Sequence, residues 1–226
     1  MSQMLELSPS LVDSFEYWQE TEDGSAWEVK AHAELIASIK REPMRPSEAM
    51  ALGLAWHKAL EGQRPVLDKV SVTLDNGARY TFCADGVRQA LDARPPSTSV
   101  EMWGNLVLPG AVLNLRADGV SGNEVHEVKS TSKEPDAERY MRTLQWRAYL
   151  LAFEAQVAVY HVCRLEWNED REVHELRSID TFRQYAYPTM RDDVETRVSA
   201  LVDFIRAEGL ESFRELPAWK AKRLGL

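Results

Sequence analysis

The segment 115–131 constrains the fold of this chain more than any other. It reads Leu-Arg-Ala-Asp-Gly-Val-Ser-Gly-Asn-Glu-Val-His-Glu-Val-Lys-Ser-Thr, so an apolar strand ends at Asp118 and a glycine-containing turn follows. The next strand carries Glu127, Val128 and Lys129. Successive side chains of a strand point to opposite faces, so Glu127 and Lys129 share one face while Val128 points into a core. If the two strands pair as a hairpin, Asp118 reaches the face of Glu127 and Lys129.

Two carboxylates and one ammonium at one point suit a hard divalent cation such as Mg²⁺. They also suit in-line attack on a phosphodiester, in which the ion activates water and lysine orients the nucleophile or stabilises the developing anion. The pattern also has a purely structural interpretation, because Asp-Gly is a common turn dipeptide and an alternating Glu/Lys strand is a common solvated face. The interpretation of Asp118, Glu127 and Lys129 therefore depends on other segments.

Length and composition indicate one globular domain without a membrane segment. The 226 residues are 44% hydrophobic and 28% charged, which suits a single large domain with its own core. No apolar run approaches the roughly 18 residues of a membrane span, and the N-terminus lacks the features of a signal peptide. Cys83 and Cys163 lie in apolar, strand-like segments. We therefore expect buried free thiols, a cytoplasmic protein and no iron–sulfur cluster, which takes about four ligands.

The charge of the chain is unevenly distributed. The formal net charge of −9 argues mildly against nucleic-acid binding, which uses Lys and Arg to contact phosphates. Residues 1–30 carry a net charge of −6, whereas residues 129–147 carry +2. The basic balance thus lies beside the carboxylate pair, and local field rather than total charge governs the steering of a polyanion.

Hydrophobic periodicity and turn residues predict alternating helices and strands. Ser47 caps one helix and Gly62 ends it. We expect one helix that starts at Pro9, four at 27–41, 48–61, 84–92 and 136–155, and one from Asp180 to about 208. We expect strands at 70–83 (a hairpin), 98–108, 111–118, 124–131, 156–166 and 171–178. No repeat or linker divides the chain. It therefore forms a single domain, 1–226, with a helical N-terminal part (1–62), a sheet core (68–178) and a helical C-terminal part (180–226).

Four further polar residues are candidates for a site. Gln145 and Tyr149 are four residues apart on one face of a predicted helix, where both can hydrogen-bond a phosphate or a base. His57 lies at the edge of an apolar helical stripe, and Glu101 lies in a predicted strand. Taken singly, each has a commoner role as a packing residue, a helix-face histidine or a solvated side chain.

Together these motifs resemble the PD-(D/E)XK nuclease superfamily, in particular the RecB-like, RecE-like and lambda-type phage recombination exonucleases. The resemblance covers about residues 7–165 and rests on four motifs: Gly53-Leu-Ala-Trp-His57 as the Gly-x-x-x-His helix, Asp118 as the motif aspartate, Glu127-Val128-Lys129 as the Glu-x-Lys element, and Gln145 with Tyr149 as the Gln-x-x-x-Tyr helix. Glu101 falls where many members carry an extra acidic residue. The chain has Ala117 where a proline often precedes the aspartate, and it lacks the four cysteines of the iron–sulfur members.

The resemblance implies a set of roles for these residues. Four of them would hold Mg²⁺, for which Mn²⁺ can substitute: His57, Asp118, Glu127 and, through its main-chain carbonyl, Val128. Three would be catalytic, with the lysine against the attacking water: Asp118, Glu127 and Lys129. Five would position DNA: Gln145, Tyr149, Arg139, Arg142 and Arg147.

The fold implied is α/β (α+β in some schemes), a restriction-endonuclease-like core with a central mixed β-sheet flanked by helices. The activity implied is that of a Mg²⁺-dependent DNA exonuclease acting at duplex ends in phage-type recombination or DNA repair. Two alternatives stay open: a catalytically silent DNA-binding or protein-interaction member of the fold, and a structure-specific endonuclease. The family further suggests a single-strand annealing protein as partner, and a ring-shaped homo-oligomer would explain processivity. Polarity and strandedness are not encoded in any motif.

Overall fold

The computed structural model describes residues 3–62, 64–95 and 99–226. The helices are α1 (Pro9–Glu20), α2 (Ala26–Ile39), α3 (Glu48–Glu61), α4 (Ala84–Asp92), α5 (Ala137–Arg142), α6 (Leu144–Ala152), α7 (Met190–Ala207) and α8 (Ala218–Leu224), with a 3₁₀ turn at Glu211–Phe213. The strands are β1 (Leu5–Leu7), β2 (Lys69–Thr73), β3 (Arg79–Cys83), β4 (Ser99–Leu108), β5 (Ala111–Ser121), β6 (Glu124–Thr131), β7 (Val157–Asn168) and β8 (Val173–Tyr185).

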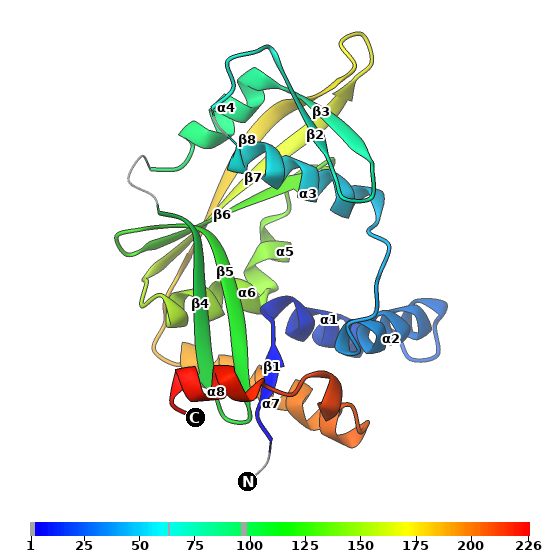
Figure 1. The fold of residues 1–226 in the computed structure, drawn as a ribbon, viewed down its shortest axis with the longest axis vertical. Coiled ribbons are helices and arrows are strands. Elements are labelled where there is room, and N and C mark those ends of the chain that lie inside the picture. The colour runs from blue at the N-terminus through cyan, green and yellow to red at the C-terminus, as the bar shows by residue number, and fades with distance from the viewer. Residues whose placement is uncertain (1–2, 63, 96–98) are drawn as a thin grey trace.

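In the described part of the chain, eight strands form one mixed sheet. Its order is β1-β5-β6-β7-β8-β3-β2, and β4 pairs with β5 alongside this path. The pairs β1/β5, β6/β7 and β3/β8 are parallel, and the other pairs are antiparallel. Figure 1 shows α3 and α4 with β2 and β3 at one end of the molecule and α1, α2, α7 and α8 at the other. The mixed sheet flanked by helices confirms the predicted α/β fold class.

Two apolar cores lie on either side of strand β6. The larger core joins α1, α2, α6 and α7 to the sheet and includes Val125. The smaller core joins α3 and α4 to the sheet and includes Val128 together with Trp56. Strand β6 therefore contributes side chains to both cores.

Short-range sequence signals located several elements correctly. Helix α3 begins after Ser47, whose hydroxyl accepts a hydrogen bond from Met50 N at 3.3 Å, and it ends at Gly62. The hairpin of β2 and β3 and the helix α4 also lie where they were predicted. Cys83 and Cys163 are free and buried, as expected. No helix in the described ranges combines the length and apolarity needed to cross a membrane.

The predicted helix 136–155 is wrong, because the chain forms two helices that meet at Thr143. Thr143 has extended backbone angles, φ −62° and ψ 147°, and its hydroxyl donates to the carbonyl of Tyr140 at 2.9 Å. Asp13 on α1 then caps the second helix, since its carboxylate accepts from Leu144 N at 2.6 Å. A contact from the far N-terminal helix thus starts α6.

The predicted helix from Asp180 is also wrong. Strand β8 continues to Tyr185 because it pairs with the whole length of β7, and α7 begins only at Met190. The Asp180 carboxylate accepts from the Ser178 hydroxyl at 2.9 Å within the strand, so a division of the chain at 180 falls inside β8. Strand β1 was missed because three residues are too short to show a period.

Candidate active site

Asp118, Glu127 and Lys129 come together where β5 and β6 pair. Gly119 lies opposite His126 in this antiparallel pair, which brings Asp118 beside Glu127. Glu127 Oε1 accepts from the backbone N–H of Asp118 at 3.2 Å, and Glu127 Oε2 accepts from Lys129 Nζ at 2.8 Å. The backbone N–H of Val128 donates to Asp118 Oδ2 at 2.8 Å. The hairpin and the shared face of the three side chains are therefore as predicted.

The charges of this cluster are largely removed from water. Burial raises the pKa of Glu127 and the pKa of Asp118 above their usual values. Burial alone would lower the pKa of Lys129, but the adjacent Glu127 carboxylate raises it above its usual value, so the ammonium stays charged. The buried carboxylate of Glu127 and the half-buried one of Asp118 thus face one ammonium, and an added cation would stabilise the ionised form of both.

His57 on α3 faces the same cluster. Its Nδ1 lies 3.5 Å from Asp118 Oδ1. Its neighbour Trp56 is buried, with its ring centroid 5.2 Å from that of Phe82, and this packing orients α3 over the hairpin. Burial, with the nearby Lys129 ammonium, lowers the pKa of His57, so the imidazole is neutral at pH 7. A neutral imidazole is the form that ligates a metal.

A cavity of about 460 Å³ opens beside these residues. His57, Asp118 and Val128 line it together with Glu101 and Arg94, which was not predicted. Arg94 Nη1 donates to the main-chain carbonyl of Asp118 at 3.4 Å, and no carboxylate in the described ranges forms an ion pair with it. No sequence signal marked Arg94, because it follows α4 outside any motif and reaches the site only through the fold.

Three comparisons relate this chain to known proteins. No family model matches it, and no curated protein matches it. Among solved structures, a phage-related exonuclease from Haemophilus somnus 129PT superimposes with a TM-score of 0.52 at 11% identity, over 91% of this chain and 96% of that one. This chain has the fold of that exonuclease.

A more distant likeness is found to an alkaline exonuclease, LHK-Exo, from Laribacter hongkongensis, with a TM-score of 0.48 and 15% identity over 97% of this chain and 94% of that one. The exonuclease fold is the one that the sequence motifs led us to expect. At 11% identity, the likeness to the Haemophilus somnus structure establishes the fold alone, and the chemistry has to be argued from the side chains.

Within this exonuclease fold, Tyr149 supports strand β5. Its hydroxyl donates to the carbonyl of Arg116 at 2.7 Å and accepts from Gln145 Nε2 at 2.9 Å. The side chain is only 3% exposed, and burial raises its pKa above the usual value. Tyr149 thus holds the backbone two residues before Asp118, while Gln145 is half-buried beside it.

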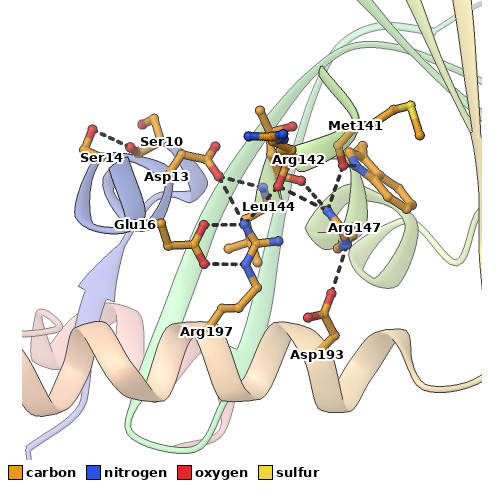
Figure 2. A network of polar contacts seen from close by, with 12 residues as sticks. Ser10, Asp13, Ser14, Glu16, Met141, Arg142, Leu144, Arg147, Asp193 and Arg197 are labelled. Atoms are coloured by element: carbon orange, nitrogen blue, oxygen red, sulfur yellow. Dashed lines mark hydrogen bonds and ion pairs between the residues drawn. The ribbon is translucent and has the colours of Figure 1, made fainter. Parts of the chain in front are cut away.

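The three predicted DNA-binding arginines differ in their surroundings. The Arg147 guanidinium is occupied by contacts within the protein. Its Nη1 donates to the carbonyls of Met141 and Thr143 at 3.1 and 2.7 Å, and its Nε lies 2.9 Å from Asp193. Figure 2 shows this arginine between the α5–α6 junction and α7. Arg142 is 74% exposed, with Glu138 at 3.8 Å.

Arg139 and Arg142 line a larger cavity, of about 1590 Å³, which α1 and α2 border. Acidic residues of α1 line it too: Asp13, Glu16 and Glu20. Glu16 forms an ion pair with Arg197, drawn in Figure 2, so part of this acidic charge is already neutralised. Arg139 and Arg142 are therefore the cations of the predicted set whose side chains can reach a ligand.

The residues at the hairpin fit a hard divalent cation by their donor chemistry. Carboxylate oxygens from Asp118 and Glu127 are the ligands that Mg²⁺ prefers, and the neutral imidazole of His57 adds one nitrogen. Among the described residues, no three His, Cys, Asp or Glu side chains already form a metal-sized group. The carboxylate oxygens instead accept from Lys129 and from two backbone N–H groups.

Proposed function

We propose that this protein is a metal-dependent DNA exonuclease that hydrolyses phosphodiester bonds at duplex ends. One observation carries the proposal: the half-buried carboxylate of Asp118 and the buried carboxylate of Glu127 meet a charged Lys129 and a neutral His57 in a chain with an exonuclease fold. A purely structural cluster would balance its buried charges, whereas this one holds an excess of negative charge beside an open cavity.

Mg²⁺, or Mn²⁺ in its place, would be held by His57, Asp118, Glu127 and the main-chain carbonyl of Val128. The bound ion would supply an activated water and neutralise charge on the phosphate. The Lys129 ammonium, held by Glu127 at 2.8 Å, would orient that water and stabilise the negative charge that develops on the phosphate. Glu101 also lines this cavity and adds another acidic group to it.

Cationic groups on two sides would hold the DNA. Arg94 lines the cavity with no carboxylate at ion-pair distance among the described residues, which suits contact with the phosphate that is cut. Arg139 and Arg142 on α5 would contact the backbone further along the strand, and Gln145 on α6 would be a further DNA contact. The resemblance of the motifs supports a cytoplasmic role in phage-type recombination or DNA repair, with a single-strand annealing protein as partner and a homo-oligomer as the working form.

The test is digestion of linear, nicked and covalently closed circular DNA, each labelled separately at the 5′ and 3′ ends. With Mg²⁺ we expect linear DNA to be shortened from its ends and closed circles to persist. Excess EDTA should stop the reaction, and Lys129→Ala is the matched inactive control.

Rapid cutting of closed circles would support the structure-specific endonuclease instead. DNA binding without cleavage under any divalent cation would support the catalytically silent alternative. Full activity in excess EDTA would overturn the metal site.

A further inference from the structure

Trp103 presents an exposed indole next to the candidate active site. It lies on β4, directly opposite Arg116 on β5. Cross-strand partners share a face of the sheet, and Arg116 and Asp118 are two residues apart on one strand. Trp103 therefore lies on the same face as Asp118, two residue pairs further from the turn of the β5–β6 hairpin.

The indole is exposed to solvent, and the Arg116 guanidinium lies over its ring. Its residue is 70% exposed, and the Arg116 guanidinium lies 5.6 Å from the ring centroid. Within the described residues, β5 is the one strand that pairs with β4, so the opposite edge of β4 bears no strand. A flat ligand can therefore reach the ring without displacing a strand.

Arg116 is already neutralised by two carboxylates. Its Nη2 donates to Glu61 at 3.0 Å and forms a second, shorter ion pair with Glu101. The pKa of Glu101 is lowered by this hydrogen bond, so both partners stay charged. Three charged groups with a net negative charge repel a phosphate, so this point of the surface favours an uncharged, aromatic ligand.

We propose that Trp103, supported by Arg116, is a stacking platform for a nucleobase of the DNA strand at the candidate active site. Base–aromatic stacking tolerates any sequence and does not depend on phosphate contacts. The platform would hold an unpaired base at the end of the duplex, so the site would prefer frayed or single-stranded ends. This inference rests on the proposed nuclease function for the identity of its ligand.

The test is binding of a fluorescent duplex with a short single-stranded overhang, measured by anisotropy with Ca²⁺ over a range of salt concentrations. Trp103→Ala should weaken binding about tenfold without changing the slope of affinity against salt. Trp103→Phe should recover most of the loss. Trp27→Ala is the matched control, because Trp27 is 66% exposed with Lys30 at 5.6 Å from its ring but lies on α2.

An overhang with abasic sites identifies the base as the ligand. Wild-type protein should lose about the same factor on abasic DNA, and Trp103→Ala should lose nothing more. Equal binding by Trp103→Ala and wild type overturns the platform. A loss of affinity in Trp103→Ala that persists on abasic DNA also overturns it, as does a total failure of the wild-type protein to bind DNA. Circular dichroism and thermal melting check that each variant is folded.

Cleavage by wild-type protein with Mg²⁺ separates the two proposals. If it cuts DNA while Trp103→Ala binds normally, the platform fails and the nuclease function stands. If wild-type protein does not cut but its binding depends on Trp103 and on the base, the nuclease function fails and the platform stands.

Discussion

Lys129 Nζ donates to Glu127 Oε2 at 2.8 Å, inside a cluster where the Glu127 side chain is 5% exposed. The ion pair therefore has two separable roles. It neutralises a carboxylate that is removed from water, and it holds an ammonium beside the cavity. A change at Lys129 affects stability and chemistry together, and a second change at Glu127 is needed to separate them.

We predict that Lys129→Ala lowers the cleavage rate by about 10²–10³, because one group that stabilises transition-state charge is lost. The same change should cost about 1–3 kcal/mol of unfolding free energy at pH 8, since Glu127 is left as a buried, unpaired acceptor. The double variant Lys129→Ala/Glu127→Gln should regain stability in urea unfolding, and it tests the stability role alone because Glu127 is itself a proposed metal ligand. Cleavage by Lys129→Ala at nearly the wild-type rate would mean that the lysine acts only through stability.

His57→Ala should weaken Mn²⁺ or Mg²⁺ binding about tenfold or more, with little change in the melting temperature in EDTA. The physical reason is that His57 lies at the edge of α3 and faces Asp118 rather than the core. Its neighbour supplies the contrast, since Trp56→Ala removes a buried indole and should cost about 3–5 kcal/mol. Calorimetric titration measures the affinity. A large loss of stability with unchanged metal affinity would assign His57 a structural role.

Arg142→Glu should weaken DNA binding and lower the slope of log affinity against log salt by about one, without changing the melting temperature. Its side chain is 74% exposed, and its exposed ion pair with Glu138 at 3.8 Å competes only weakly with a phosphate. Arg147→Ala should instead lower the melting temperature and leave the salt slope unchanged, because its guanidinium donates to three carbonyls of the α5–α6 junction and pairs with Asp193. Anisotropy and melting experiments on the pair check the assignment, and a reversed result would exchange the two roles.

Glu6→Gln should lower the unfolding free energy by about 1–2 kcal/mol at pH 7. Burial acts to raise the pKa of Glu6, but hydrogen bonds from Lys220 and Arg41 dominate and lower it from 4.5 to about 2. A lowered pKa stabilises the folded state above the unfolded value, so the contribution is complete above pH 4.5 and is lost as the pH falls through about 2.

The difference between wild type and Glu6→Gln in denaturant unfolding should therefore shrink below pH 4.5. Glu208→Gln, at an exposed carboxylate, is the control. A difference that is constant from pH 7 to pH 3 would show that charge on Glu6 is not the cause.

The sequence alone determined those features that depend on neighbours in the chain. Ser47 and Gly62 set the ends of α3 because caps act within one turn of a helix. The alternation of Glu127, Val128 and Lys129 put the two charged side chains on one face because the strand period is two. The Gly-containing turn predicted the approach of Asp118 to that face, so the central cluster and the α/β class could be predicted without coordinates.

Contacts between residues far apart in the chain decided the rest. The carboxylate of Asp13 starts α6 at Leu144, which no local pattern around Thr143 indicates. Pairing with β7 holds Asp180 in a strand, although its local sequence resembled a helix start.

The same long-range contacts decided which candidate side chains are accessible. Packing buried Tyr149 and bound Arg147 to Asp193, whereas it brought Arg94 to the cavity and left Trp103 exposed beside it. The reason is physical: periodicity fixes the direction in which a side chain leaves its own strand or helix. Burial, ion pairing and access to a cavity depend on which other element the tertiary fold packs against it.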